Sequence, residues 1–288
     1  RDHRLVLTSE LILLDGWSGG LLVTSLLGFY TDAAAEAARP VPSFRAYLDW
    51  VNGRDRRESI DAWRRELDGF DEPALLRPGL LDRAADLSTA GEVRRDLPAG
   101  LAERLDAVAR ETGVTPGTLF ETAWGLVLMG LTGRDDVVFG ASVSGRNPEV
   151  EGVESIVGLL FNTIPVRVRA GAADPLAAVL ERVQASRSEL FDHDHVALAD
   201  VQRATGLGTL FDTLFVFQNF PGMPTGRGFG PDGGLRVLGR EVRDATHYPI
   251  TIVVEPGAGL RVMYRGDAFT EAETRRITDR YVRVLEQV

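Results

Sequence analysis

The sequence of 288 residues predicts an α/β protein built on a mixed sheet. Segments with apolar residues at helical spacing alternate with short apolar runs that are typical of strands. Some neighbouring runs are separated by a helix-length segment, as parallel strands require, and others only by a turn, as antiparallel strands allow. Hydrophobic residues make up 44% of the chain, which is enough for a sizeable core. The length suits one large domain or two of ordinary size.

The first part of the chain is predicted to hold one strand and three helices. The expected elements are a strand over 4–14, helices over 17–36, 44–52 and 57–67, and a connection over 69–92. The strand assignment rests on a dense apolar run, which Asp15 and Gly16 end with a turn. Ser43 can cap the second helix, and scattered Gly and Pro residues indicate the connection.

The rest of the chain is predicted to alternate between helices and strands. Helices are expected over 98–112, 117–132, 175–191, 196–204 and 270–286, and strands over 136–143, 161–169, 210–218, 234–241, 249–255 and 259–265. Pro116 suits the first turn of a helix, and Thr270 with Glu273 has the spacing of a capping box. Pro165 argues against a central place in the sheet for its strand.

Composition excludes several classes of function. The formal net charge of −10 argues against a nucleic-acid surface, which needs a basic face. Without Cys the chain has no disulfide, thiolate metal site or Cys nucleophile. No apolar run is long enough to span a bilayer and no signal-peptide pattern is present, so we expect a cytoplasmic protein with no membrane partner. All 32 basic residues are Arg, which we interpret as codon bias.

Three local patterns suggest chemistry but are weak. Residues 16–20 satisfy G-x-S-x-G, with Ser18 as a nucleophile, but a hydrolase elbow follows a central strand and too few residues precede this one. His193 and His195 alternate with Asp, yet two residues apart they do not share a helix face and no third ligand cluster is near. Residues 226–230 are Gly-rich without a following helix, so we interpret them as a surface loop.

A fourth pattern is more informative, because several segments together resemble one family. In residues 9–18 an apolar run ends in Asp15-Gly16 and leads into a helix. The other matching segments are 47–50 with 62–69, 115–119 with 123–124, 132–140, 142–146, 157–167, 210–213, 216–221 and 248–249. Their order over essentially the whole chain resembles the condensation-domain family of nonribosomal peptide synthetases, which is related to the chloramphenicol acetyltransferase-like fold.

The resemblance implies a two-lobed α/β fold of mixed sheets and flanking helices, with a tunnel between the lobes. In that family a carrier-bound amine attacks a carrier-bound acyl thioester and an amide forms. The expected partners are carrier domains upstream and downstream, with an adjacent adenylation domain or a recruited tailoring enzyme as further candidates. No cofactor or metal is expected on the chain itself, because the phosphopantetheine arms of the carrier domains bring the substrates.

The chain departs from the family at the catalytic motif, which is His-His-x-x-x-Asp-Gly. Aligned on Asp15-Gly16, the two His positions hold Glu10 and Leu11. The Leu11 side chain has no titratable group and makes no hydrogen bond. It therefore cannot take the role of the second His, whose imidazole has a pKa near the working pH and can orient or deprotonate the amine. Glu10 could act as a carboxylate base, but adjacent strand residues point to opposite faces. The sequence therefore predicts a degenerate active site.

Two alternatives stay open beside a condensation domain with a lost or noncanonical His. Heterocyclisation domains carry Asp-x-x-x-x-Asp-x-x-Ser, and Glu10, Asp15 and Ser18 have this spacing with Glu for the first Asp. Against it, the run 161–165 is of the amide-forming type. A catalytically inactive module that docks carrier domains or recruits a tailoring enzyme is the other alternative, since fold does not fix function.

The remaining site residues follow from the resemblance. Asp15 is expected to pair with Arg146, since Arg suits a buried bidentate pair, and Ser18, Asn162 and Asn219 are expected to be structural or to line the tunnel.

The resemblance also predicts a division of the chain into two lobes. Residues 1–75 would end the first lobe, which is expected to be incomplete, so that Arg1 would not be a natural start. Residues 76–92 would connect the lobes and 93–288 form the second, with a floor loop over 144–160 and a latch over 221–234.

Overall fold

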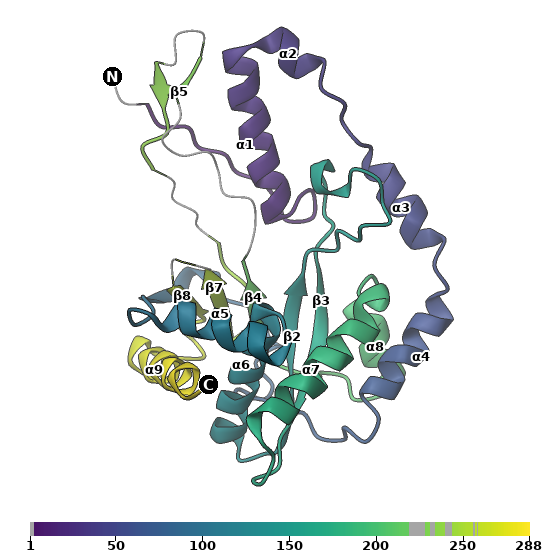
Figure 1. The fold of residues 1–288 in the computed structure, drawn as a ribbon, viewed down its shortest axis with the longest axis vertical. Helices are drawn as coiled ribbons and strands as arrows, with labels where there is room; N and C mark the ends of the chain where they lie inside the picture. The colour runs from purple at the N-terminus through teal and green to yellow at the C-terminus, as the bar shows by residue number, and fades with distance from the viewer. Residues whose placement is uncertain (1–2, 219–227, 231–233, 240–243, 256, 258) are drawn as a thin grey trace. The chain divides into compact units, whose positions relative to one another are not determined.

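A computed structural model describes residues 3–218, 228–230, 234–239, 244–255, 257 and 259–288 (Figure 1). These residues form two compact units that are discontinuous in sequence. The first unit contains the residues up to Arg54, the segment 144–161 and the described part of 220–243, and the second contains the others. The linear division at 76–92 stays a prediction.

The second unit is built on one mixed sheet of six strands in the order β1-β8-β7-β4-β2-β3. The strands are β1 (Gly91–Arg95), β2 (Asp136–Val143), β3 (Asn162–Arg169), β4 (Thr213–Phe217), β7 (Ile250–Glu255) and β8 (Gly259–Tyr264). β4 is parallel to both β2 and β7, and the outer pairs are antiparallel. The predicted α/β class with a mixed sheet is confirmed. Pro165 lies on the edge strand β3, opposite Gly140 of β2, where its missing N–H leaves the sheet intact.

Helices cover this sheet. They are α4 (Arg56–Glu66), α5 (Leu101–Thr112), α6 (Pro116–Thr132), α7 (Leu176–Leu190), α8 (Leu198–Thr205) and α9 (Glu271–Gln287), with short 3₁₀ turns η1 (Leu87–Thr89) and η3 (Phe191–His193). α5, α6, α7 and α9 lie together on one face (Figure 1). The predicted capping box of Thr270 and Glu273 begins α9. In the core, the rings of Trp124 and Tyr281 meet edge to face at 5.8 Å, and both side chains are fully buried.

The first unit is mostly helical. It contains α1 (Gly16–Thr31), α2 (Ala33–Ala37), α3 (Phe44–Asn52), the 3₁₀ turn η2 (Val153–Ser155) and the antiparallel pair β5 (Gly228–Phe229) and β6 (Leu235–Arg236). Ser43 caps α3 as predicted, with its side chain accepting from Arg45 N. A small apolar cluster of Tyr47, Val150, Val153, Ile156 and Leu160 holds α3 against the segment 144–161. No helix among the described residues is long and apolar enough to cross a membrane.

One predicted strand is wrong in the described chain, and a second is shorter than predicted. Residues 4–14 form no strand: they are irregular, with a turn over 11–13, and their apolar side chains are exposed except that of Leu14, which is half-buried. A strand needs a neighbour that satisfies its backbone groups, and no strand among the described residues pairs with this segment. Of the strand expected over 234–241, the described residues 234–239 form only β6, and residues 240–241 lie outside the described residues. The sequence missed β1, whose first residues were assigned to the connection.

Candidate active site

Asp15 is the N-cap of α1 and is buried in the first unit. Its Oδ1 accepts a hydrogen bond from Ser18 N at 2.8 Å, which satisfies a free donor in the first turn. Its Oδ2 accepts from Leu160 N at 3.1 Å, and its own N–H donates to Gly158 O at 3.1 Å. One residue therefore both starts the helix and fixes it to the segment 144–161.

Arg146 connects that segment to α1. Its Nη2 lies 3.3 Å from Asp15 Oδ1, and both side chains are almost completely buried. Its Nη1 donates to Val153 O at 2.6 Å and to Ile156 O at 2.9 Å, and its guanidinium lies over the Trp17 ring at 4.9 Å. Burial lowers the pKa of Arg146, while the Asp15 carboxylate opposes the shift. The structure thus brings the predicted pair into contact and gives Arg146 two further backbone acceptors.

Ser18 is fully buried, and its hydroxyl is saturated. Ser18 Oγ donates to Gly158 O at 2.8 Å and accepts from Gly158 N at 3.0 Å and from Arg146 Nη2 at 3.2 Å. A nucleophilic serine needs a base within hydrogen-bond reach, and no imidazole is among these partners. The geometry fits a structural role and disfavours Ser18 as a nucleophile.

Gly145 lies very close to the backbone of Leu160, which Asp15 also contacts. Its φ is +64°, a region that favours glycine, and an added Cβ would overlap the carbonyl oxygen of Leu160. That carbonyl also accepts a hydrogen bond from Tyr47 Oη at 3.3 Å, and burial raises the pKa of Tyr47. A side chain at position 145 would displace the backbone that Asp15 holds.

Gly145→Ala is expected to lower the free energy of unfolding of the first unit by at least about 2 kcal/mol, from backbone strain and the overlap with Leu160. The loss is measured by unfolding the protein in urea, with hydrogen exchange of the amides of residues 144–161 as the probe. Gly69→Ala is the control for backbone strain without overlap, since Gly69 has φ +70° and open space around it. Gly69 lies in the second unit, so its loss is measured on the unfolding of that unit. Equal losses in the two variants would contradict the role given to the Leu160 contact.

Glu10 and Leu11, the residues predicted at the two motif His positions, lie directly before and within a turn. Glu10 O accepts from Leu13 N at 3.0 Å, which closes the turn over 11–13. Both side chains are exposed, that of Leu11 by 51%. Because this segment is no strand, the expectation that the two side chains point to opposite faces has no basis here. Gly16 is the first residue of α1.

The other predicted site residues lie elsewhere. Asn162 begins β3 in the second unit, where its Nδ2 donates to Asp194 O at 2.8 Å and Val196 O at 2.7 Å; this is a structural contact with the turn after α7. Asn219 and most of the predicted latch, residues 221–227 and 231–233, lie outside the described residues. The described part of the latch contributes β5.

The histidines form no metal site. His193 Nδ1 lies 3.0 Å from Ser59 Oγ, and its carbonyl accepts from Trp63 Nε1 at 3.1 Å. Within the described part of the chain no three His, Cys, Asp or Glu side chains gather to hold a metal ion.

Sequence reasoning missed two features. The backbone of Gly158, which holds Ser18 on both sides, carries no sequence signal. The second is a buried cluster of Glu121, Arg187 and Asp194 in the second unit. Glu121 could have been noticed, because it is a charged residue on the apolar face of a helix.

Solved structures define the class of fold. The X-domain from teicoplanin biosynthesis superposes with a TM-score of 0.74 at 20% identity, covering 97% of this chain and 68% of that chain. The first condensation domain of the CDA synthetase superposes with a TM-score of 0.69 at 23% identity, covering 96% and 62%. The chain therefore has the chloramphenicol acetyltransferase-like α/β fold that was predicted.

The sequence comparisons go further than the fold. Residues 1–288 match the family described as Condensation domain. The chain is 35% identical to chondramide synthase cmdD of Chondromyces crocatus over 92% of its length, and 30% identical to vanchrobactin synthetase VabF of Vibrio anguillarum, also over 92%. It belongs to the condensation-domain family of nonribosomal peptide synthetases. It spans only 7% and 9% of the length of these two curated relatives.

Proposed function

We propose that this domain forms an amide bond between a carrier-bound acyl donor and a carrier-bound aminoacyl acceptor, without an imidazole base. The observation that carries the proposal is the buried contact set of Asp15, Arg146 and Ser18 at the position of the family motif. Burying two charges costs free energy, and their attraction offsets this cost only when the two groups are held in good geometry. The presence of all three contacts therefore supports a domain whose function still requires a fixed geometry in this part of the site.

The proposed reaction leaves the chain little chemistry to do. The acceptor amine attacks the carbonyl carbon of the donor thioester, the C–N bond forms, the C–S bond breaks, and the donor thiolate takes the proton that the amine loses through solvent. Holding two reactants in an attack geometry is alone worth several kcal/mol. Leu11 offers no base, and Glu10 lies exposed before a turn, so positioning would supply most of the rate.

The proposed partners are peptidyl or acyl carrier domains upstream and downstream, whose phosphopantetheine arms hold the substrates covalently. Membership of the condensation-domain family supports carrier domains in general. An adjacent adenylation domain would load the acceptor. No residue of this chain is assigned to a cofactor of its own.

A second candidate is an inactive module that docks carrier domains or recruits a tailoring enzyme. The absence of a titratable group at Leu11 favours it. The X-domain from teicoplanin biosynthesis, whose complex with OxyB has been solved, shares the fold with a TM-score of 0.70. A heterocyclisation variant is less well supported, because the Ser18 hydroxyl is already engaged in three hydrogen bonds.

Leu11→His is expected to raise the rate of dipeptide formation about tenfold, when the full natural polypeptide is given loaded carriers. A well-held general base contributes about 10²–10⁴-fold, but an imidazole on this exposed turn would not be held. The gain should disappear below about pH 6, where the imidazole is protonated. Product is measured by mass spectrometry of the acceptor carrier.

The control is Leu13→His, in the same exposed turn, which should leave the rate unchanged. Product from the wild type above the uncatalysed rate is the expected result for the main proposal. If carriers bind but the wild type gives no product, while Leu11→His does, the domain is an inactive module and the amide-forming proposal is wrong.

A further inference from the structure

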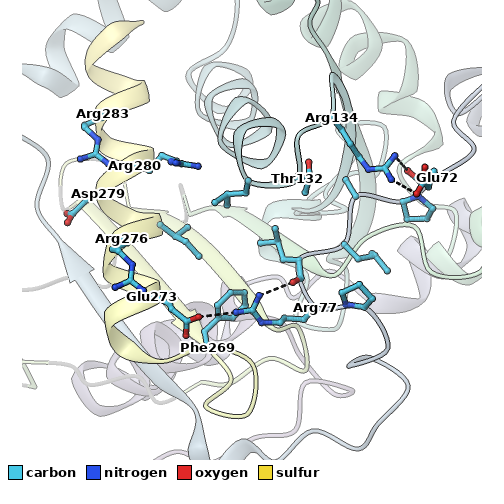
Figure 2. A pocket seen from close by; sticks show the side chains of 17 residues that line it. Glu72, Arg77, Thr132, Arg134, Phe269, Glu273, Arg276, Asp279, Arg280 and Arg283 are labelled. Carbon is cyan, nitrogen blue, oxygen red and sulfur yellow. Dashed lines mark hydrogen bonds and ion pairs between the residues drawn. The ribbon is translucent and has the colours of Figure 1, made fainter.

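A pocket of about 970 Å³ lies in the second unit, among the loop 72–78, the end of α6 and one side of α9 (Figure 2). Part of its wall is apolar, with Pro73, Leu76, Leu131 and Ile277 among the lining residues. Its volume is in the range of ligand sites. None of the residues assigned to amide formation lines it, so what it binds is a separate question.

Charge in this pocket is unevenly distributed. Two of its five arginines are already paired within the chain: Arg134 lies 2.5 Å from Glu72, and Arg77 lies 3.3 Å from Glu273 and stacks on Phe269. Each pair contributes no net charge to the pocket, and each connects the loop 72–78 to a neighbouring element.

The three remaining arginines follow one another along α9. They are Arg276, Arg280 and Arg283, which are exposed (Figure 2). Among the described residues none of the three has an ion pair within 4 Å: Asp279 on the same helix pairs with Arg95, and Glu273 pairs with Arg77. Hydrogen bonds from Thr270 and, at longer range, the charge of Arg276 lower the pKa of the Glu273 carboxyl. Arg280 Nη1 contacts only the Gly130 carbonyl, at 3.2 Å. This row of exposed positive charge occurs in a chain whose net charge is −10.

We propose that this pocket binds an extended acidic segment of a partner protein. Arg276 and Arg283 are seven positions apart, which corresponds to about 10 Å of helix at ~1.5 Å per residue. An extended peptide advances ~3.3 Å per residue, so carboxylates on alternate residues recur about every 6.6 Å. Five residues with three alternating carboxylates can therefore meet all three guanidinium groups in paired geometry.

The shape of the pocket selects this ligand over a free phosphate. One phosphate is too small to engage guanidinium groups that are spread along two turns of helix, and it would leave the apolar wall exposed to water. Apolar side chains between the carboxylates would cover that wall. The partner is therefore a polypeptide that alternates acidic and apolar residues, and the positive charge would also speed its encounter.

The experiment measures binding of a fluorescein-labelled peptide of alternating Glu and Leu, about eight residues long, to the full chain by fluorescence anisotropy at low salt. Binding should weaken as salt is raised. The variant Arg276→Glu/Arg280→Glu/Arg283→Glu should weaken it at least tenfold. The same peptide with Gln in place of Glu should not bind.

A matched variant controls for net charge. Arg57→Glu/Arg65→Glu/Arg110→Glu changes three exposed arginines of α4 and α5, with the same change in charge, and should bind the peptide as the wild type does. Circular dichroism of both variants checks that they fold. An equal loss in the two variants would show unspecific attraction and overturn the proposal. So would binding of inorganic phosphate or pyrophosphate that depends on the three α9 arginines when the peptide does not bind.

Discussion

Replacing Arg146 by Met is expected to lower the free energy of unfolding of the first unit by about 3–5 kcal/mol. The change leaves the Asp15 carboxylate buried without its cation, which is the costly way to break a buried ion pair. It also removes the donors to Val153 O and Ile156 O. Met keeps much of the side-chain volume, so the loss reports charge and hydrogen bonding more than packing. Urea unfolding, followed by hydrogen exchange of residues 144–161, measures it.

Asp15→Asn tests the same pair from the other side and should cost less, about 1–3 kcal/mol. Asn still caps α1 through the acceptor that Ser18 N uses, and Arg146 keeps its two carbonyl acceptors. The acceptor for Leu160 N is lost, because the amide of Asn has only one oxygen. The double variant should lose less than the two single losses together, because the second change no longer strands a charge.

Arg45→Met is the control for removing a guanidinium, since Arg45 pairs with Asp49 on the exposed side of α3, and it should change little. If Asp15→Asn costs more than Arg146→Met, the Arg146 contacts to backbone carbonyls do not carry the weight given to them here.

Local signals in the sequence predicted the helices well. Caps and periodicity act within a few residues, so Ser43, Pro116 and Thr270 mark helix starts that the structure reproduces. Strands depend on neighbours that are remote in sequence. The run 4–14 is as apolar as any buried strand, but apolar character indicates burial, not pairing, and no neighbour pairs with it in the described chain.

The candidate site was predictable only in part. The contact of Asp15 with Arg146 was expected because the resemblance placed both residues in family motifs. The contacts that surround the pair use backbone groups of Gly158, Val153 and Ile156, and every residue type carries such groups. Sequence therefore identifies the charges of the site but not the backbone atoms that hold them.

Asp194→Asn is expected to stabilise the second unit at pH 8 and to flatten the pH dependence of its unfolding. Glu121 on α6 and Asp194 after η3 share one cation: Arg187 Nε lies 3.5 Å from Glu121 Oε2, and Nη1 lies 3.6 Å from Asp194 Oδ1. Burial raises the pKa of Asp194 to about 7, against the attraction of Arg187, and also raises the pKa of Glu121. Both carboxylates cannot be compensated by one guanidinium.

The sign follows from proton binding. An Asp with an ordinary pKa of 3.8 in the unfolded chain and about 7 in the folded chain binds more protons when folded, between about pH 4 and 7. The free energy of unfolding therefore falls as pH rises through this range. The pKa difference corresponds to at most about 4 kcal/mol, and the Asp194→Asn change would leave the Glu121–Arg187 pair neutral.

Urea unfolding of wild type and variant at pH 5 and pH 8 measures the effect, since other titrating groups contribute equally to both proteins. At pH 5 the wild-type Asp194 is protonated and the two proteins should be similar, whereas at pH 8 the variant should be the more stable. Asp106→Asn, which changes an exposed carboxylate on α5 that does not contribute to the pKa shift of Asp194, should keep the wild-type slope. If Asp194→Asn keeps that slope as well, Asp194 stays ionised across the range and the cluster tolerates two carboxylates on one cation.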